Sequence, residues 1–504
     1  MKRTCLLFIV LSFVTMLLLA CNEIENVNPE VSSVVEQKQT TLTRIVNVTQ
    51  EEAYTIADRF VSSELGKDIF LTKGANTNSN LVKSSATVRE DGQDLMHVFN
   101  FEGGGFIIIG ATRNYYPILA YSDKGSFLLK DDMGPVDVWL DETKVCIKNS
   151  ELSDETTKSQ MLSLWARFDG TYTDPTLAFR SAHGSQTRST GEDACWERID
   201  SLQALYSSEG WTFLPLSFVE ELFSNLGLSN EYSSICYSAT QNHSALNETI
   251  IGYKNPVVAT VGPLINTLWN QDSPFGDLCP NRVAGCAAVA AGQVMYYHQY
   301  PPTMTWAGDN FYWYQIPHEA DSNSKQPHLM RMLGQKFQMK YFFHPLGNTS
   351  GTYDPFIESG LDSLGFYATL DSFTDNHPFN PLTVNNELFN YARPVIMNGT
   401  AIYTSPPDTS GHTWVCEGAQ DIYVNRLYYF TENQPYGAGA FTQGMYSINN
   451  PGDVGNVNFM INFYMNWGEG ENGNGRNGWF ASNDVNSYYG NYKYNRSNIY
   501  VIKP

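Results

Sequence analysis

The chain has 504 residues, of which 42% are hydrophobic and 16% are charged, and its formal net charge is −21. This balance excludes a wholly disordered chain, because such chains carry few apolar residues and many charges. The acidic excess would repel phosphate backbones, so nucleic acid is not an expected partner. The length allows about two to four domains. An aromatic share of 13% together with 39 Gly favours β-structure with long loops over a helical bundle.

The N-terminus has the pattern of an export signal: a basic start precedes an apolar run that is too short for a typical spanning helix. The run ends Leu-Leu-Ala-Cys at residues 18–21, which resembles a bacterial lipobox, where cleavage precedes a cysteine that is then lipidated. We therefore expect a signal peptide over residues 1–20, lipidation at Cys21 and a polar tether over 21–45. Ordinary cleavage after Ala20 is the alternative. A lipid anchor would place the exported protein in the cell envelope, at the outer membrane or another periplasmic or extracellular face.

The eight cysteines are scattered too widely for a disulfide scaffold. The sequence contains no CxxC and no paired Cys/His spacing suited to zinc, so no metal and no cofactor is expected. Cys279 and Cys286 are close enough in sequence to form a bridge, and the sequence leaves that open.

A first folded region begins near residue 46. Thr49 is a plausible helix N-cap with Glu52 three residues later, and apolar residues follow at helical spacing. The pattern then changes to a meander of short strands with glycine turns, over residues 97–101, 105–109 and 116–121. A polar stretch at residues 181–193 is the clearest linker.

The most informative segment starts at Gly285-Cys286, where an Ala-rich run to His298 favours a helix. Cys286 would then lie at the helix N-terminus, where free N–H groups and the helix dipole stabilise a thiolate. Gly285 leaves room for close approach. A buried structural cysteine in front of a core helix is the alternative interpretation.

A nucleophilic thiol needs a base. His298 lies twelve residues along the same helix, about 18 Å away and out of reach. His412 instead precedes a strand-like run at residues 413–419, and a histidine at the mouth of a strand can face a cleft. A second alternating strand over residues 457–467 ends in Asn466-Trp467, an amide and an indole that suit orienting and shielding an imidazole.

Together these motifs resemble the streptopain family of papain-like cysteine peptidases. The resemblance rests on the Cys286 helix, Gly411-His412 and Asn466-Trp467-Gly468, and it covers roughly residues 255–504. Upstream, Trp269-Asn270-Gln271 is similar to the oxyanion glutamine segment of that family. Residues 101–106 and 117–122 resemble the inhibitory prodomain of the family.

The resemblance implies an α+β fold, with a papain-like two-lobed peptidase (a helical lobe and an antiparallel β lobe) preceded by an α+β prodomain. It places the prodomain at residues 46–185, a connecting segment at 186–250 and the peptidase domain at 251–504. The protein would be a cysteine-type endopeptidase made as a zymogen. Its partners would be protein or peptide substrates, and its own prodomain would act as an intramolecular inhibitor.

The resemblance also implies the role of each site residue. Cys286 would be the nucleophile and His412 the general base and later the general acid. The Gln271 amide and the Cys286 backbone N–H would stabilise the oxyanion. Asn466 or Trp467 would orient and cover the imidazole, and the sequence does not decide between them. Two other functions stay open: a catalytically silent binding or inhibitory lipoprotein on the same scaffold, and a papain-fold acyl transferase.

Overall fold

The computed structural model describes most of the chain outside its N-terminus and the middle and late loops. It covers residues 46–62, 82–130, 133–134, 136–171, 257–345, 347–374, 377–404, 407–423, 426–432, 459–470, 476–482 and 496–504, with short pieces of 199–254 and residues 441–442. Of its two compact units, Met1–Val48 and Thr49–Pro504, the second holds all the helices and strands named here. The predicted signal peptide, Cys21 and the tether lie outside the described residues, as does most of the predicted connecting segment.

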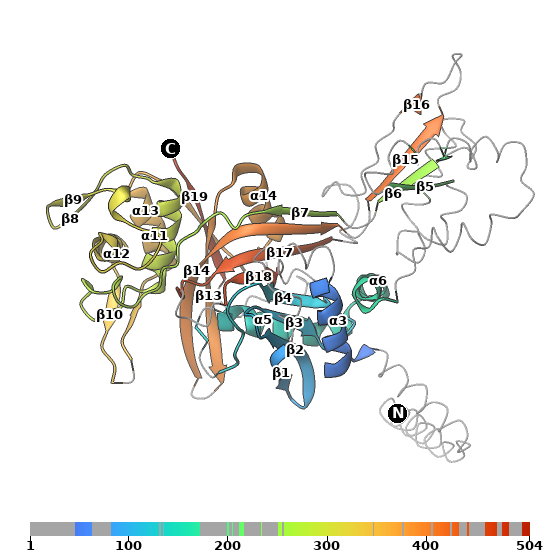
Figure 1. Ribbon diagram of the computed structural model, residues 1–504. Helices are drawn as coiled ribbons and strands as arrows, with labels where there is room; N and C mark the ends of the chain where they lie inside the picture. The colour runs from blue at the N-terminus through green and yellow to red at the C-terminus, as the bar shows by residue number, and fades with distance from the viewer. Residues whose placement is uncertain are drawn as a thin grey trace, which may run out of the picture. The chain divides into compact units, whose positions relative to one another are not determined.

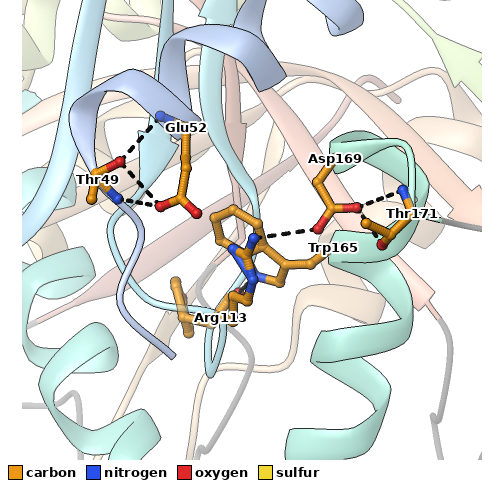
Figure 2. Close-up of polar contacts among 7 residues, drawn as sticks. Thr49, Glu52, Arg113, Trp165, Asp169 and Thr171 are labelled. Atoms are coloured by element: carbon orange, nitrogen blue, oxygen red, sulfur yellow. Dashed lines mark hydrogen bonds and ion pairs between the residues drawn. The ribbon is translucent and has the colours of Figure 1, made fainter. Parts of the chain in front are cut away.

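The N-terminal region combines helices with an antiparallel meander. Its elements are α3 (Gln50–Ser62), β1 (Val82–Glu90), β2 (Gln93–Phe101), β3 (Phe106–Gly110), β4 (Ile118–Ser122), α5 (Val136–Asn149), the 3-10 turn η1 (Ser150–Leu152) and α6 (Glu155–Asp169). The predicted capping box of α3 is confirmed: the Glu52 N–H donates to Thr49 Oγ1 at 3.2 Å, and the Thr49 N–H donates to Glu52 Oε2 at 2.8 Å (Figure 2).

Helix α6 is tied to the turn between β3 and β4 through an aromatic and ionic contact. The Arg113 guanidinium lies 5.2 Å from the Trp165 ring centroid and pairs with Asp169 at 3.4 Å (Figure 2). Asp169 also accepts the Thr171 N–H at 2.9 Å beyond the helix end. The Trp165 indole N–H donates to the Tyr115 carbonyl, so this buried ring has no unsatisfied donor.

A helical lobe surrounds the predicted nucleophile helix, and α11, α12 and α13 lie together in Figure 1. Helix α11 is apolar on all sides and its residues 287–295 are all buried, as expected of a central core helix. The elements of this lobe are α11 (Cys286–His298), β8 (Met304–Trp306), β9 (Asp309–Phe311), η4 (Trp313–Gln315), α12 (Gln326–Lys336), β10 (Lys340–Phe342), β11 (Thr349–Gly351) and α13 (Asp354–Asp362).

The remaining elements form a lobe of antiparallel strands with one helix. They are β7 (Val257–Val261), β12 (Tyr367–Ser372), α14 (Pro381–Tyr391), β13 (Val395–Thr404), β14 (Pro407–Tyr423), β17 (Phe459–Asn466), β18 (Gly478–Ala481) and β19 (Ser497–Ile502). A second, four-stranded sheet contains β5 (Trp211–Pro215), β6 (Ile250–Lys254), β15 (Arg426–Glu432) and β16 (Phe441–Thr442).

One eleven-stranded sheet joins the N-terminal meander to the C-terminal lobe, in the order β1-β2-β3-β4-β18-β17-β14-β13-β19-β12, with β7 paired to β14. The junction is the antiparallel pair β4–β18, with Phe480 opposite Ala120 and Trp479 opposite Tyr121. Beside it the fully buried Tyr121 hydroxyl donates to Gln420 Oε1 at 2.5 Å. Desolvation raises the pKa of Tyr121 far above its usual range, so the phenol stays a neutral donor.

The predicted α+β class is confirmed, with antiparallel sheets and packed helices. Across the described ranges no helix combines the length and apolar character that crossing a bilayer requires.

Candidate active site

Cys286 is the first residue of α11, as the sequence predicts. Gly285 precedes it with φ 90°, and a Cβ there would lie 3.1 Å from Met339 Cε and from atoms of Ser350. Both facts favour glycine, because an L side chain rarely adopts this conformation and its Cβ would make unusually tight contacts. The Gly285 carbonyl accepts the first helical N–H bonds, from Ala288 at 3.1 Å and Val289 at 3.2 Å.

The Cys286 thiol is free, and the residue as a whole is half-buried. Burial of the sulfur raises the pKa of Cys286, while hydrogen bonds from the Thr413 backbone and side chain and from the start of α11 act in the opposite direction. The expected stabilisation of a thiolate is therefore present, but in this conformation desolvation outweighs it. The structure thus holds Cys286 as a thiol rather than as a reactive thiolate.

His412 lies inside β14, opposite Gly399 of β13, and is half-buried. The prediction that His412 opens the strand is wrong. Strand β14 begins upstream of His412, at Pro407, because the residues before His412 also pair with β13. This extension depends on a partner strand, so the local sequence pattern could not reveal it.

The thiol and the imidazole lie on opposite faces of β14. Val415 belongs to the core cluster around α11, and Thr413, two residues away and in contact with the Cys286 thiol, shares that face. Side chains alternate along a strand, so His412 shares the other face with Trp414. The structure therefore brings the Cys286 thiol into contact with Thr413, the residue after His412, on the opposite face of the strand from the one to which alternation assigns His412.

Helix α5 of the N-terminal region covers the His412 face. A Cβ at Gly399 would lie 2.5 Å from Val138 Cγ1 of α5 and 3.3 Å from Trp414. Arg496, just before β19, lies over the Trp414 ring at 5.2 Å and pairs with Glu142 of α5 at 2.5 Å. The Arg496 and Glu142 side chains are only 10% and 5% exposed, so this ion pair is enclosed between α5 and the sheet.

Gln271 is half-buried in the loop between β7 and α11. Its carbonyl accepts the Ala284 N–H at 2.8 Å, which fixes the loop two residues before Cys286. The neighbouring Trp269 is fully buried and donates its indole N–H to the Pro317 carbonyl at 3.1 Å. The backbone around Gln271 is thereby anchored to the start of α11, as an oxyanion donor would need to be.

Asn466 is the last residue of β17 and is buried on the α11 face, opposite Val415. Its Nδ2 donates to Glu417 Oε1 at 2.9 Å, and its Oδ1 accepts from Gln293 Nε2 at 3.2 Å and from the Gly468 N–H at 3.2 Å. Neither Glu417 nor Gln293 was predicted as a site residue. The sequence feature that could have identified them is that each is a polar residue within an otherwise apolar run.

Trp467 packs on the other face. Its ring centroid lies 5.3 Å from that of Trp414 and 5.1 Å from that of Phe480, and its indole N–H donates to the Arg476 carbonyl. Trp467 thus lies with Trp414 on the His412 side, whereas Asn466 lies on the Cys286 side. This separates the two predicted partners of the imidazole.

Of the other predicted features, Cys21 lies outside the described residues. Cys279 is buried and free, so it forms no bridge with Cys286 in this structure. Among the residues that the structure describes, no three His, Cys, Asp or Glu side chains gather as metal ligands.

Residues 46–147 match the family model described as Spi protease inhibitor, and residues 269–480 match that of the Peptidase C10 family. Similar solved structures include a prointerpain A fragment from Prevotella intermedia. It is 14% identical, with a TM-score of 0.41, over 82% of this chain and 97% of that one. Active interpain A cysteine protease from the same organism is 18% identical, with a TM-score of 0.31, over 48% and 94% of the two chains. None of the curated proteins matches the chain.

Proposed function

Because the chain is a cysteine peptidase of the Peptidase C10, or streptopain, family with a Spi-type inhibitor domain in front, we propose that it is an exported, lipid-anchored endopeptidase kept latent by its own prodomain. Cys286 is the nucleophile of this proposal and His412 its base. The observation that carries it is the position of the Cys286 thiol, at the N-terminus of α11 and in hydrogen-bond contact with Thr413, the residue after His412.

Latency in this proposal has two causes. Strand alternation assigns the His412 side chain to the α5 face of β14, away from the thiol on the Thr413 face, and burial raises the pKa of Cys286, which favours the protonated sulfur. Removing α5 would uncover the His412 face. Gly411 has no atom within 4 Å of where its Cβ would lie, and the β13–β14 pairing around His412 would have to rearrange for the His412 side chain to change faces. We infer that the imidazole then turns to the Thr413 face and meets the thiol.

In the active arrangement His412 would withdraw the Cys286 proton as the sulfur attacks the scissile carbonyl. It would then give that proton to the leaving amine, and water would resolve the acyl-enzyme. The Gln271 amide and the Cys286 backbone N–H are the proposed donors to the tetrahedral oxyanion. Loss of one such donor typically lowers kcat by about 10²–10³-fold.

The test compares uncleaved protein with protein matured by cleavage between residues 181 and 257. Matured protein should hydrolyse casein, and Cys286→Ala should abolish both hydrolysis and labelling by an epoxide probe. Activity that persists in Cys286→Ala would contradict the assignment. A matured wild-type protein without activity would favour a silent binding lipoprotein. Transfer of the acyl group to added glycinamide in preference to water would favour an acyl transferase.

The lipid anchor is a separate part of the proposal and rests on the sequence at residues 18–21. Cys21→Ser should shift the protein from the membrane fraction to the culture fluid or periplasm and remove the mass of the acyl groups from its N-terminal peptide. An unchanged N-terminal mass would contradict lipidation.

A further inference from the structure

A continuous chain of buried hydrogen bonds runs through the side chain of Asn466. The Ile265 N–H donates to Glu417 Oε2 at 2.5 Å, Asn466 Nδ2 donates to Glu417 Oε1 at 2.9 Å, and Gln293 Nε2 donates to Asn466 Oδ1 at 3.2 Å. Glu417, Asn466 and Gln293 are 1%, 3% and 0% exposed. A carboxyl group so completely removed from water needs a reason, because burying it is costly unless every bond is made.

These hydrogen bonds link the four segments that hold the proposed site residues. Ile265 lies in the segment that leads to Gln271, and Gln293 is on the helix that starts at Cys286. Glu417 is on β14, five residues after His412, and Asn466 ends β17. Glu417 is itself part of β14, and its two carboxyl oxygens bind the Ile265 segment and the end of β17. It is connected to α11 through Asn466.

Two backbone N–H groups determine which atoms donate and which accept in this series of hydrogen bonds. The Gly468 N–H points at the Asn466 oxygen, so the Asn466 amide nitrogen must face Glu417. The Ile265 N–H occupies the second Glu417 oxygen. A residue at position 417 must therefore accept an N–H bond at each of its two terminal atoms, which a carboxyl group can do and an amide cannot.

The bond between Gln293 and Asn466 is the one most easily exchanged. It is the longest of the three, and Gln293 Oε1 is buried and has no hydrogen-bond partner among the described residues. Gln293 is thus held by its donor alone. A stronger donor that reached Asn466 Oδ1 could displace it, and a charged imidazolium is a stronger donor than an amide.

We propose that Glu417 is a positioning residue of the peptidase: it holds the Asn466 amide with Oδ1 directed at the place that the His412 imidazole takes on activation. This inference rests on the proposed function, since it assumes that the imidazole turns to the Asn466 face. Glu417 touches neither substrate nor thiol and acts through Asn466. It also decides between the two candidates for orienting His412, in favour of Asn466.

The test uses the matured form of the full-length protein and the isosteric variant Glu417→Gln. The oxygen of the new amide would take the fixed Ile265 N–H, so its NH₂ group would face Asn466 Nδ2, and the Asn466 amide would have to flip against the Gly468 N–H. We expect kcat to fall by about 10²-fold, the loss typical of a misplaced reacting group, while KM changes little, because Glu417 does not contact the substrate.

The double variant Glu417→Gln/Asn466→Asp exchanges donor and acceptor and restores the bond between these two side chains. It should recover roughly tenfold or more of kcat relative to Glu417→Gln, because interacting sites are not additive. The matched control is Glu387→Gln. Glu387 lies on α14 and its carboxylate pairs with Arg393, so this variant also loses a carboxylate but should keep wild-type kcat.

Wild-type kcat in a folded Glu417→Gln variant would overturn the inference. So would a double variant that is folded, by its melting curve, and no more active than Glu417→Gln. If Glu417→Gln alone fails to fold, the folded double variant still decides, since the inference requires it to be active. A wild-type matured protein without turnover would instead contradict the proposed function itself.

Discussion

Substituting Gly399 by alanine should weaken the docking of α5 and release latency without cutting the chain. Gly399 lies in β13 opposite His412, and its missing side chain is what allows α5 to approach. An alanine Cβ would lie 2.5 Å from Val138 Cγ1, 2.9 Å from Arg496 Cδ and 3.3 Å from Trp414. The nearest of these distances is roughly 1 Å inside ordinary carbon–carbon contact.

The cost follows from packing. Forcing an extra methyl group into a well-packed site typically costs about 1–3 kcal/mol. Most of this strain disappears once α5 leaves, because Val138, the closest neighbour, leaves with it. The docking equilibrium should therefore shift towards the open form by about 5- to 150-fold, the ratio that 1–3 kcal/mol represents.

The assay is turnover of a fluorogenic peptide by uncleaved protein whose linker is made resistant to cleavage. Gly399→Ala should raise this basal rate, while matured Gly399→Ala and matured wild type should turn over at similar rates. In a Val138→Ala background the Gly399→Ala change should add little, because the colliding methyl groups are gone. An unchanged basal rate in uncleaved Gly399→Ala would refute the claim that α5 covers the His412 face.

Three further predictions concern the site and its cover. His412→Ala should lower kcat of the matured protein nearly as much as Cys286→Ala, because the two act as a unit; a loss below about tenfold, measured by peptide turnover, would contradict a dyad. Glu142→Gln leaves Arg496 buried without its counter-ion, so the basal turnover of uncleaved protein should rise, and an unchanged rate would show that the ion pair does not hold α5. Burial raises the pKa of Glu417 to about 8 from 4.5, so the free energy of unfolding should fall as pH rises from about 4.5 to 8. Urea titrations at pH values of about 5.5 and 8 should show this loss in wild type and a smaller loss in Glu417→Gln.

The local elements of the site follow from the sequence. The Ala-rich run with its leading glycine predicts α11, and the structure begins the helix at Cys286 and ends it at His298. The meander of residues 97–121 appears as β2, β3 and β4, and the capping box of α3 is formed as predicted. Each of these depends on side chains within a few residues of one another, which is why a single sequence suffices.

The arrangement of the site does not follow from the sequence, because it is set by distant partners. The face that His412 takes depends on the register of β14 with β13, and a shift of one residue would exchange it with Thr413. The role of Glu417 depends on Asn466, 49 residues away. Helix α5 can pack on the His412 face because Gly399 of β13, which is distant in sequence, has no side chain in its way.

The most direct test of the central claim is the rate at which an epoxide probe labels Cys286 before and after maturation, with the modified residue identified by peptide mass mapping. A latent peptidase with a split dyad predicts slow labelling of uncleaved protein and fast, selective labelling of Cys286 in matured protein, in step with the appearance of casein hydrolysis. Equal labelling rates in the two forms, or hydrolysis that appears while Cys286 remains unmodified by saturating probe, would contradict it.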